Sequence, residues 1–313
     1  MEALAGLKIS AKQVQLITER VGQRLVKERT EATAAFFAPG PPKRPAPAHR
    51  PGLLVISADG GRLQTLQDDP PLEWKEDKVA MVYEVTATPE RPGVQYQGPK
   101  PIGRSMVATM EPWDTLGDIA STLADQRGYL DAKQVLFISD GATGIRTLRQ
   151  RCFPQARFIL DWKHATDHLY EVSQAAFGPT DKARTWLDLQ KDRLWNGRVH
   201  RILADLRKQA QRLGPPKNNA PDNDPRRVVA QNVEYFKTNR EAMDYPTFRK
   251  KGWPLGSGIV ESAIKQLGKR MTGLEKHWSI SGAEQTLQVI TSLLSEDSRW
   301  DDFWKRGACA CVA

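Results

Sequence analysis

Two Asp-Gly pairs follow strongly apolar segments of the chain. Asp59 comes shortly after LLVIS at 53–57, and Asp140 comes directly after QVLFIS at 134–139. Continuous apolar runs of this length are typical of strands buried on both faces, and a glycine lets the backbone turn where the strand ends. Both carboxylates would then lie at the carboxyl edge of a sheet, where ligands collect in open α/β folds. For either pair alone, an ordinary turn stays open as the alternative.

Glu261 is the candidate third carboxylate. It follows Gly256-Ser257-Gly258, small residues that allow a close approach of the backbone to metal or substrate. On a helix within 253–273 it would share one polar side with Lys265 and Lys269, opposite the apolar Ile264, Leu267 and Met271. A solvated face with a Glu–Lys pair one turn apart is the alternative.

Three carboxylates gathered in one place would be metal ligands. Hard oxygen donors suit Mg²⁺ or Mn²⁺, and two such ions can clamp the attacking and leaving oxygens of a phosphoryl displacement. We therefore predict that Asp59, Asp140 and Glu261 are catalytic residues that hold two divalent ions.

Asp161, His164 and His168 form a D-x-x-H-x-x-x-H pattern at the start of a predicted helix. Two histidines four residues apart share one helix face, a spacing that ligates zinc in H-E-x-x-H, but here residue 165 is alanine. Three interpretations remain open: accessory residues beside the carboxylates, a zinc site, or ordinary structural histidines.

Positive charge gathers around Glu261. The chain has a net charge of +9, and 249–276 holds seven Lys or Arg against two Glu. A basic balance favours a polyanionic partner such as DNA without proving one, and Trp278 is placed to stack on a base. The predicted DNA-binding residues are Arg249, Lys250, Lys251, Lys265, Lys269, Arg270, Lys276 and Trp278.

The elements that must position these residues indicate an α/β fold. Further strands are expected over 78–87, 104–110 and 156–161, with helices over 114–127, 143–151 and 162–176. This order is typical of a ribonuclease-H-like mixed sheet, although other mixed folds share it. Residues 178–250 predict an α-helical insertion before the last catalytic helix, which leaves 53–177 and 251–304 as the catalytic domain. In that order the strands that lead to Asp59 and Asp140 are neighbours.

The ends of the chain are simpler. Residues 1–37 predict a helical segment capped by Ser10, and 38–52 form a linker with six prolines. Ser281 and Glu284 predict a capping box that opens a final helix to about Leu294.

The composition excludes some classes of protein. Three cysteines, two of them the C-x-C pair Cys309 and Cys311 that we interpret as incidental, form no disulfide framework, which indicates a reducing compartment. No apolar run approaches a membrane span or a secretory signal. We therefore expect neither a membrane protein nor an exported one.

With these residues in place, the chain resembles the DDE transposases of bacterial insertion sequences, nearest the Kra-type subgroup and more distantly the Mutator-like transposases. The matching segments are SADGG at 57–61, EWKEDKVAMV at 73–82, FISDGATGIRTL at 137–148, CFPQARFILDWKHATDHL at 152–169, WPLGSGIVESAIKQLGKRM at 253–271, HWS at 277–279 and RWDDFW at 299–304. The resemblance implies that Asp59, Asp140 and Glu261 form the DDE triad and that DWKH is the family's (Cys/Asp)-x-x-His element. Family members carry a longer N-terminal region, so residues 1–37 would be a remnant of a helix-turn-helix module in a truncated copy.

The resemblance implies a transposase that cleaves and transfers DNA strands at the ends of an insertion sequence, with Mg²⁺ or Mn²⁺. Its partners would be the terminal inverted repeats, target DNA and further copies of itself, in the bacterial cytoplasm at the nucleoid. Two other functions stay open. One is a structure-specific nuclease of the same fold, and the other is a non-catalytic DNA-binding relic.

Overall fold

A five-stranded mixed sheet organises the molecule. The computed structural model describes residues 9–40, 49–66, 72–274 and 276–310, with the backbone alone at 308–310. The strand order is β3-β2-β1-β4-β5, with β1 at Leu54–Leu66, β2 at Leu72–Val85, β3 at Pro101–Thr109, β4 at Val135–Ser139 and β5 at Arg157–Leu160. The first three strands are antiparallel, whereas β4 pairs in parallel with both β1 and β5. The prediction that the strands leading to Asp59 and Asp140 are neighbours is confirmed.

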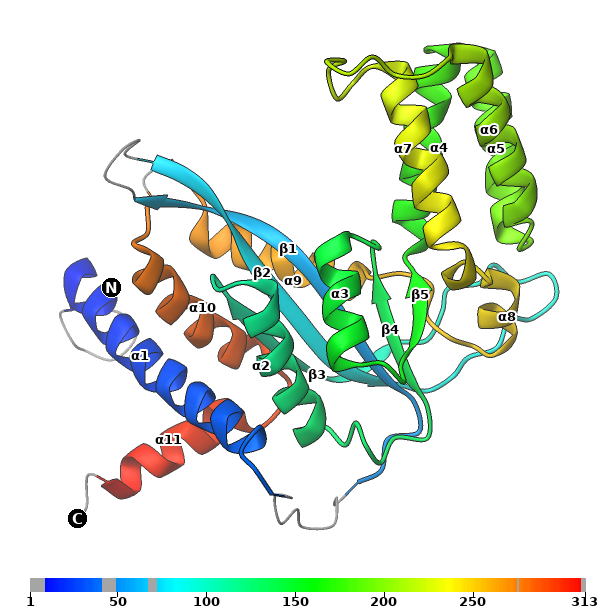
Figure 1. Ribbon diagram of the computed structural model, residues 1–313. Helices are drawn as coiled ribbons and strands as arrows, with labels where there is room; N and C mark the ends of the chain where they lie inside the picture. Colours follow the sequence, from blue (N-terminus) through cyan, green and yellow to red (C-terminus); the bar gives the residue numbers. More distant parts are fainter. Residues whose placement is uncertain (1–8, 41–48, 67–71, 275, 311–313) are drawn as a thin grey trace.

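Helices cover both faces of this sheet (Figure 1). On one face lie α2 (Trp113–Gln126) and α3 (Thr143–Cys152), and on the other lie α9 (Gly258–Met271) and α10 (Ile280–Leu294). Leu54 and Ile56 of β1 are buried on the α2 side, and Val55 is buried on the α9 side. The continuous apolar run of β1 therefore reflects burial on both faces, because successive side chains of a strand point to opposite faces.

A helical bundle stands beyond the β5 edge of the sheet (Figure 1). It contains α4 (Trp162–Phe177), α5 (Asp181–Trp195), α6 (Val199–Leu213) and α7 (Pro225–Thr238). A 3-10 turn at Arg240–Ala242 and the short α8 (Tyr245–Lys250) lead the chain back toward the sheet. The helical character expected for 178–250 is observed, and α4 packs with α5 and α7 as part of the same bundle.

The N-terminal helix α1 (Ala11–Phe36) belongs to the main body. Ser10 caps it as predicted, because its Oγ accepts from the N–H of Gln13 at 3.2 Å and the Gln13 side chain accepts from the N–H of Ser10 at 2.8 Å. The helix is continuous, and the interpretation of 1–37 as a remnant of a helix-turn-helix module stays a prediction. Gly22 packs so closely on α10 that a Cβ there would lie 2.3 Å from the carbonyl oxygen of Gln285.

The strand β1 does not end at Asp59, which corrects the expected turn. It continues to Leu66 because it stays paired with β2, while its parallel pairing with β4 stops at Ser57. Gly60 and Gly61 leave room for the side chains of Glu76 and Asp77, whose oxygens would lie 2.7 and 2.6 Å from an added Cβ.

The capping box at Ser281 and Glu284 is also wrong. The cap of α10 is Ser279, whose Oγ accepts from the N–H of Gly282 at 3.0 Å. Glu284 instead accepts from the N–H of Met110 at 2.7 Å and pairs with Arg29 at 2.8 Å, so it joins α1 and the edge of β3 to α10. A further helix, α11 (Arg299–Ala310), follows α10.

Two predictions fall partly outside the described residues. One is the proline-rich linker, of which 41–48 are not described, and the other is the C-x-C pair, of which Cys311 and the side chain of Cys309 are not described. Of the helices in the described ranges, none combines the length and apolar character that crossing a membrane requires.

Candidate active site

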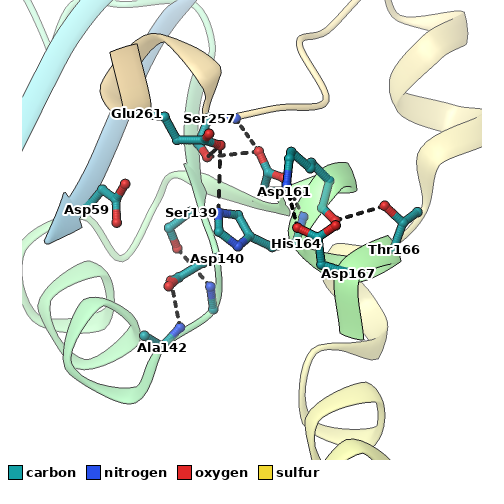
Figure 2. Close-up of polar contacts among 12 residues, drawn as sticks. Asp59, Ser139, Asp140, Ala142, Asp161, His164, Thr166, Asp167, Ser257 and Glu261 are labelled. Carbon is teal, nitrogen blue, oxygen red and sulfur yellow. Dashed lines mark hydrogen bonds and ion pairs between the residues drawn. The ribbon is translucent and has the colours of Figure 1, made fainter. Parts of the chain in front are cut away.

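Asp59 and Asp140 lie next to each other in the sheet, where the parallel pairing of β1 with β4 ends. Asp59 comes two residues after the last parallel pair between these strands, and Asp140 is the first residue after β4. Glu261 projects from the first turn of α9, which packs over β1. Figure 2 shows these carboxylates and the ring of His164 around one shared space.

The carboxylate of Asp59 is held in an electrostatically unfavourable position. It is half-buried and accepts one hydrogen bond, from the N–H of Gly60 to Oδ1 at 2.8 Å. The pKa of Asp59 is raised from 3.8 to about 6, chiefly by burial and also by the charges of Asp140 and Glu261, while the Gly60 hydrogen bond and His164 oppose the rise. A divalent cation at this position would offset the free-energy cost of burying the Asp59 charge and the repulsion among the three carboxylates.

The turn after β4 has the form expected from its sequence. Oδ1 of Asp140 accepts from the N–H of Ala142 at 2.9 Å, at the start of α3. Gly141 has a φ of +81°, and a Cβ there would lie 2.7 Å from Cδ1 of Leu160. Only glycine meets both demands without strain, so this Asp-Gly pair marks a genuine turn at the site.

The tightest group of potential metal ligands differs from the predicted triad. Ligand atoms of Asp161, His164 and Glu261 lie within 4.8 Å of one another, and Nε2 of His164 is 3.7 Å from Oε1 of Glu261. Among the described residues, Asp59 and Asp140 do not join a group as tight as this. The shared binding of divalent ions by Asp59, Asp140 and Glu261 stays a prediction, and the Asp59 carboxylate interacts electrostatically with both of the others.

His168 lies apart from His164. Its ring stacks on that of Tyr235 with 3.8 Å between centroids, and its Nδ1 is 3.4 Å from a carboxylate oxygen of Glu171. The zinc site that the histidine spacing allowed is therefore not formed by the described residues, and His168 packs against α7.

Sequence reasoning missed Tyr235. Its hydroxyl donates to the carbonyl oxygen of Asp140 at 2.8 Å, and burial holds its pKa well above the usual range. Tyr235 lies on α7, 95 residues after Asp140, and no local sequence pattern predicts a contact over that separation.

One of the predicted DNA-binding residues is structural, and a second is partly buried. Arg249 is 6% exposed, and its guanidinium lies 2.6 Å from a carboxylate oxygen of Glu90 and 3.8 Å from the ring centroid of Trp195. Trp278 is half-buried, and its indole N–H donates to the carbonyl oxygen of Met271 at 2.7 Å. The prediction for Arg249 is corrected because its guanidinium is buried and bound within the protein, whereas stacking of a base on the partly exposed Trp278 ring stays a prediction.

The other predicted contacts face solvent and stay predictions. The Lys265 side chain is 74% exposed, and its ammonium nitrogen lies 4.0 Å from a carboxylate oxygen of Glu261. It therefore stands beside the candidate metal site and remains free to meet a phosphate. The remaining exposed residues of the set are Lys250, Lys251, Lys269, Arg270 and Lys276.

The donor set fits a hard divalent cation. Asp59, Asp140 and Glu261 offer carboxylate oxygens, and His164 adds an imidazole nitrogen beside them. Oxygen-rich sets of this kind suit Mg²⁺ and Mn²⁺, and the nitrogen favours Mn²⁺ of the two.

The raised pKa of Asp59 predicts a pH-dependent stability of the metal-free protein. Because the folded state holds the proton up to about pH 6 and the unfolded state releases it near 3.8, stability is lost as pH rises through this window. The loss by pH 7 is on the order of 2 to 3 kcal/mol. Asp59→Asn should therefore be more stable than the wild type at pH 7 and equal to it at pH 3.5.

Urea unfolding of both chains in EDTA between pH 3.5 and 8 measures that difference. The raised pKa of Asp77, also about 6, acts equally in both chains and cancels from the comparison. A difference in the free energy of unfolding that stays constant from pH 3.5 to 8 would contradict a raised pKa of Asp59.

Comparisons with known proteins assign no family. No family model matches the chain, and no curated protein matches its sequence. Among solved structures, the chain is similar to the Drosophila P element transposase strand transfer complex, at 11% identity over 92% of this chain and 93% of that chain. The TM-score is 0.34, a similarity too low to assign a fold or a function to this chain.

Proposed function

We propose that this chain is a metal-dependent polynucleotidyl transferase, a DNA transposase of the DDE type. One observation carries the proposal: parallel neighbours β1 and β4 place Asp59 and Asp140 next to each other where their pairing ends, and the Asp59 carboxylate interacts with both Asp140 and Glu261. Charge repulsion of this kind is common where a site is built to bind a cation.

The strand order also supports the finer assignment. An antiparallel β3-β2-β1 unit extended by parallel β4 and β5 is the arrangement expected of a ribonuclease-H-like domain. In this proposal α5 to α8 form the helical insertion before α9, the helix that supplies the last catalytic residue. The chain would act as an oligomer on the ends of a bacterial insertion sequence.

Each residue then has a defined task. Asp59, Asp140 and Glu261 would hold two Mg²⁺ or Mn²⁺, which supply activation of the attacking hydroxyl and stabilisation of the leaving oxygen. The exposed ammonium groups of Lys265 and Lys269 would bind the DNA phosphates beside Glu261. His164 would stay next to Glu261 as a supporting residue, and its replacement by alanine should cost less than loss of a carboxylate.

Removal of the metal tests this function. The full chain is incubated with duplexes taken from the DNA on either side of its reading frame, in Mg²⁺, Mn²⁺, Ca²⁺ or EDTA. We expect cleavage and joining with Mg²⁺ or Mn²⁺, binding with little cleavage in Ca²⁺, and no cleavage in EDTA.

The other outcomes separate the alternatives. Cleavage without joining would indicate the nuclease, and DNA binding without cleavage in any metal would indicate the relic. Cleavage that survives EDTA would remove the two-metal mechanism.

Phosphate contacts from α9 predict a salt-dependent affinity. Each neutralised phosphate contributes a slope of about −0.9 to the logarithmic dependence of the binding constant on salt. Replacing Lys265 and Lys269 together by glutamine should flatten that slope by roughly one to two units, whatever the base sequence. The measurement is fluorescence anisotropy with duplex DNA at several salt concentrations.

Lys208 supplies the control. It is an exposed lysine on α6 and lies outside the predicted DNA-binding set, so Lys208→Gln should leave the slope unchanged. An unchanged slope in the α9 double variant would place the DNA on another surface.

A further inference from the structure

The buried carboxylate of Asp161 lies between the starts of two helices. Its Oδ1 accepts from the N–H of His164 at 2.8 Å and so caps α4. Its Oδ2 accepts from the hydroxyl of Ser257 at 2.8 Å and also from the N–H of Ser257, at the start of α9. Both helices direct the positive ends of their dipoles at this one carboxylate, which is 1% exposed.

Ser257 occupies the cap position of α9 without capping that helix. A serine there normally accepts from a backbone N–H in the first turn, but Ser257 makes no such bond. Its hydroxyl is donated across to Asp161 and lies 3.5 Å from Oε1 of Glu261. The cap residue of α9 is therefore used to fix the helix to α4.

Backbone contacts complete the connection. The N–H of Trp162 donates to the carbonyl oxygen of Leu255 at 2.9 Å, just before α9. The N–H of Asp161 donates to the carbonyl oxygen of Ser139 at 2.9 Å, next to Asp140. Asp161 thus ties the end of β4 to α4 and α9, the elements that present Asp140, His164 and Glu261 (Figure 2).

Asp161 is a poor candidate for a metal ligand in spite of its closeness to His164 and Glu261. Three donors already occupy its two oxygens, and water does not reach it. A cation bound there would have to displace hydrogen bonds that hold two helices.

We propose that Asp161, through Ser257, is a positioning residue that fixes Glu261 against His164 for metal binding. This inference rests on the proposed function of Glu261 as a metal ligand. Residues that orient a ligand in this way typically account for a 10- to 100-fold difference in metal affinity.

Asp161→Asn is the decisive variant. An asparagine keeps the size of the side chain but replaces one oxygen by an NH₂ group, so whichever way it turns, a donor faces the N–H of Ser257 or of His164. The start of one helix is then released. Asp167→Asn is the matched control, since it removes the same charge from an exposed site on α4 that pairs with Lys163.

The first readout is the affinity for Mn²⁺ alone, measured by calorimetry on the full chain without DNA. We expect Asp161→Asn and Glu261→Gln each to weaken binding by tenfold or more, and Asp167→Asn to leave it unchanged. Combined with Glu261→Gln, the Asp161→Asn change should add nothing, because its effect passes through Glu261. Losses that multiply in the double variant, or an unchanged affinity in Asp161→Asn, would overturn the proposal.

Ser257→Ala keeps the inference testable if Asp161→Asn does not fold. It removes one hydrogen bond to Asp161 and retains the bond from the backbone N–H. A several-fold loss of Mn²⁺ affinity that vanishes in the Glu261→Gln background supports the positioning role, and an unchanged affinity contradicts it.

A second readout separates this inference from the proposed function. The side-chain resonances of His164, followed by NMR without metal, report the position of Glu261 beside the ring. They should move in Ser257→Ala and stay in place in Asp167→Asn. A wild-type chain that binds no Mn²⁺ would refute the proposed function alone, whereas His164 resonances unmoved by Ser257→Ala would refute the positioning role.

Discussion

Replacing Asp59 or Asp140 by asparagine, or Glu261 by glutamine, should lower metal-dependent DNA cleavage by roughly a thousandfold or more, about 4 kcal/mol of barrier. These changes keep side-chain size and remove the negative charge that holds the cation. Asp59→Asn should also retain the hydrogen bond from Gly60, because its amide oxygen can still accept it. The loss of activity would then come from metal binding and not from the fold.

Initial rates with the duplex substrate and saturating Mg²⁺ measure the effect, alongside DNA affinity in Ca²⁺. Affinity for DNA should persist in all three variants, since the phosphate contacts come from other side chains. Glu171→Gln is the control: it removes an exposed charge from α4 beside His168 and should leave the rate unchanged. Full activity in Glu261→Gln would indicate that Glu261 is not a metal ligand and belongs to an ordinary solvated helix face.

The sheet could be predicted from the sequence because burial leaves a local signature. Residues 53–56, shortly before Asp59, are all apolar, and β1 indeed buries Leu54 and Val55 on opposite faces. The length of β1 could not be predicted, because the glycines after Asp59 have the composition of a turn. They lie opposite Lys78 and Asp77 of β2, and their role there depends on partners distant in the sequence.

The sequence could suggest candidate site residues one at a time, but it could not show how they are connected. Asp161 and Ser257 are 96 positions apart, and only the packing of α4 against the start of α9 brings them together. A local pattern can show that a carboxylate follows a strand or opens a helix. It cannot show how many protein donors bind a given carboxylate. Three donors bind Asp161, whereas Asp59 accepts one hydrogen bond, from Gly60.

Charge was the least informative signal at single positions. Arg249 and Lys250 are adjacent and equally basic in the sequence, yet one is buried and the other exposed. The difference follows from the turn of α8, which directs Arg249 toward Trp195 and Glu90. Clustering of basic residues therefore predicts a partner for the region, while the task of each residue depends on the face it occupies.

Arg249→Ala should lower the free energy of unfolding by about 2 to 4 kcal/mol. The truncation leaves the Glu90 carboxylate and the carbonyl oxygen of Trp195 without their donor and opens space against the Trp195 ring. The partial exposure of Glu90 places the expected loss below that of a fully buried pair. Arg249→Lys should recover part of the loss, because it keeps the charge without the planar stacking group.

Lys250→Ala is the matched comparison, since that side chain is exposed at the end of the same short helix. Urea unfolding should show the loss in Arg249→Ala alone, and the salt slope of DNA binding should change in Lys250→Ala alone. The opposite pattern would be a stable Arg249→Ala protein that binds DNA with a flatter salt slope. That result would indicate that Arg249 contacts DNA. Because the two residues are adjacent and both basic, their different burial is the property that we expect to separate a structural arginine from a DNA contact.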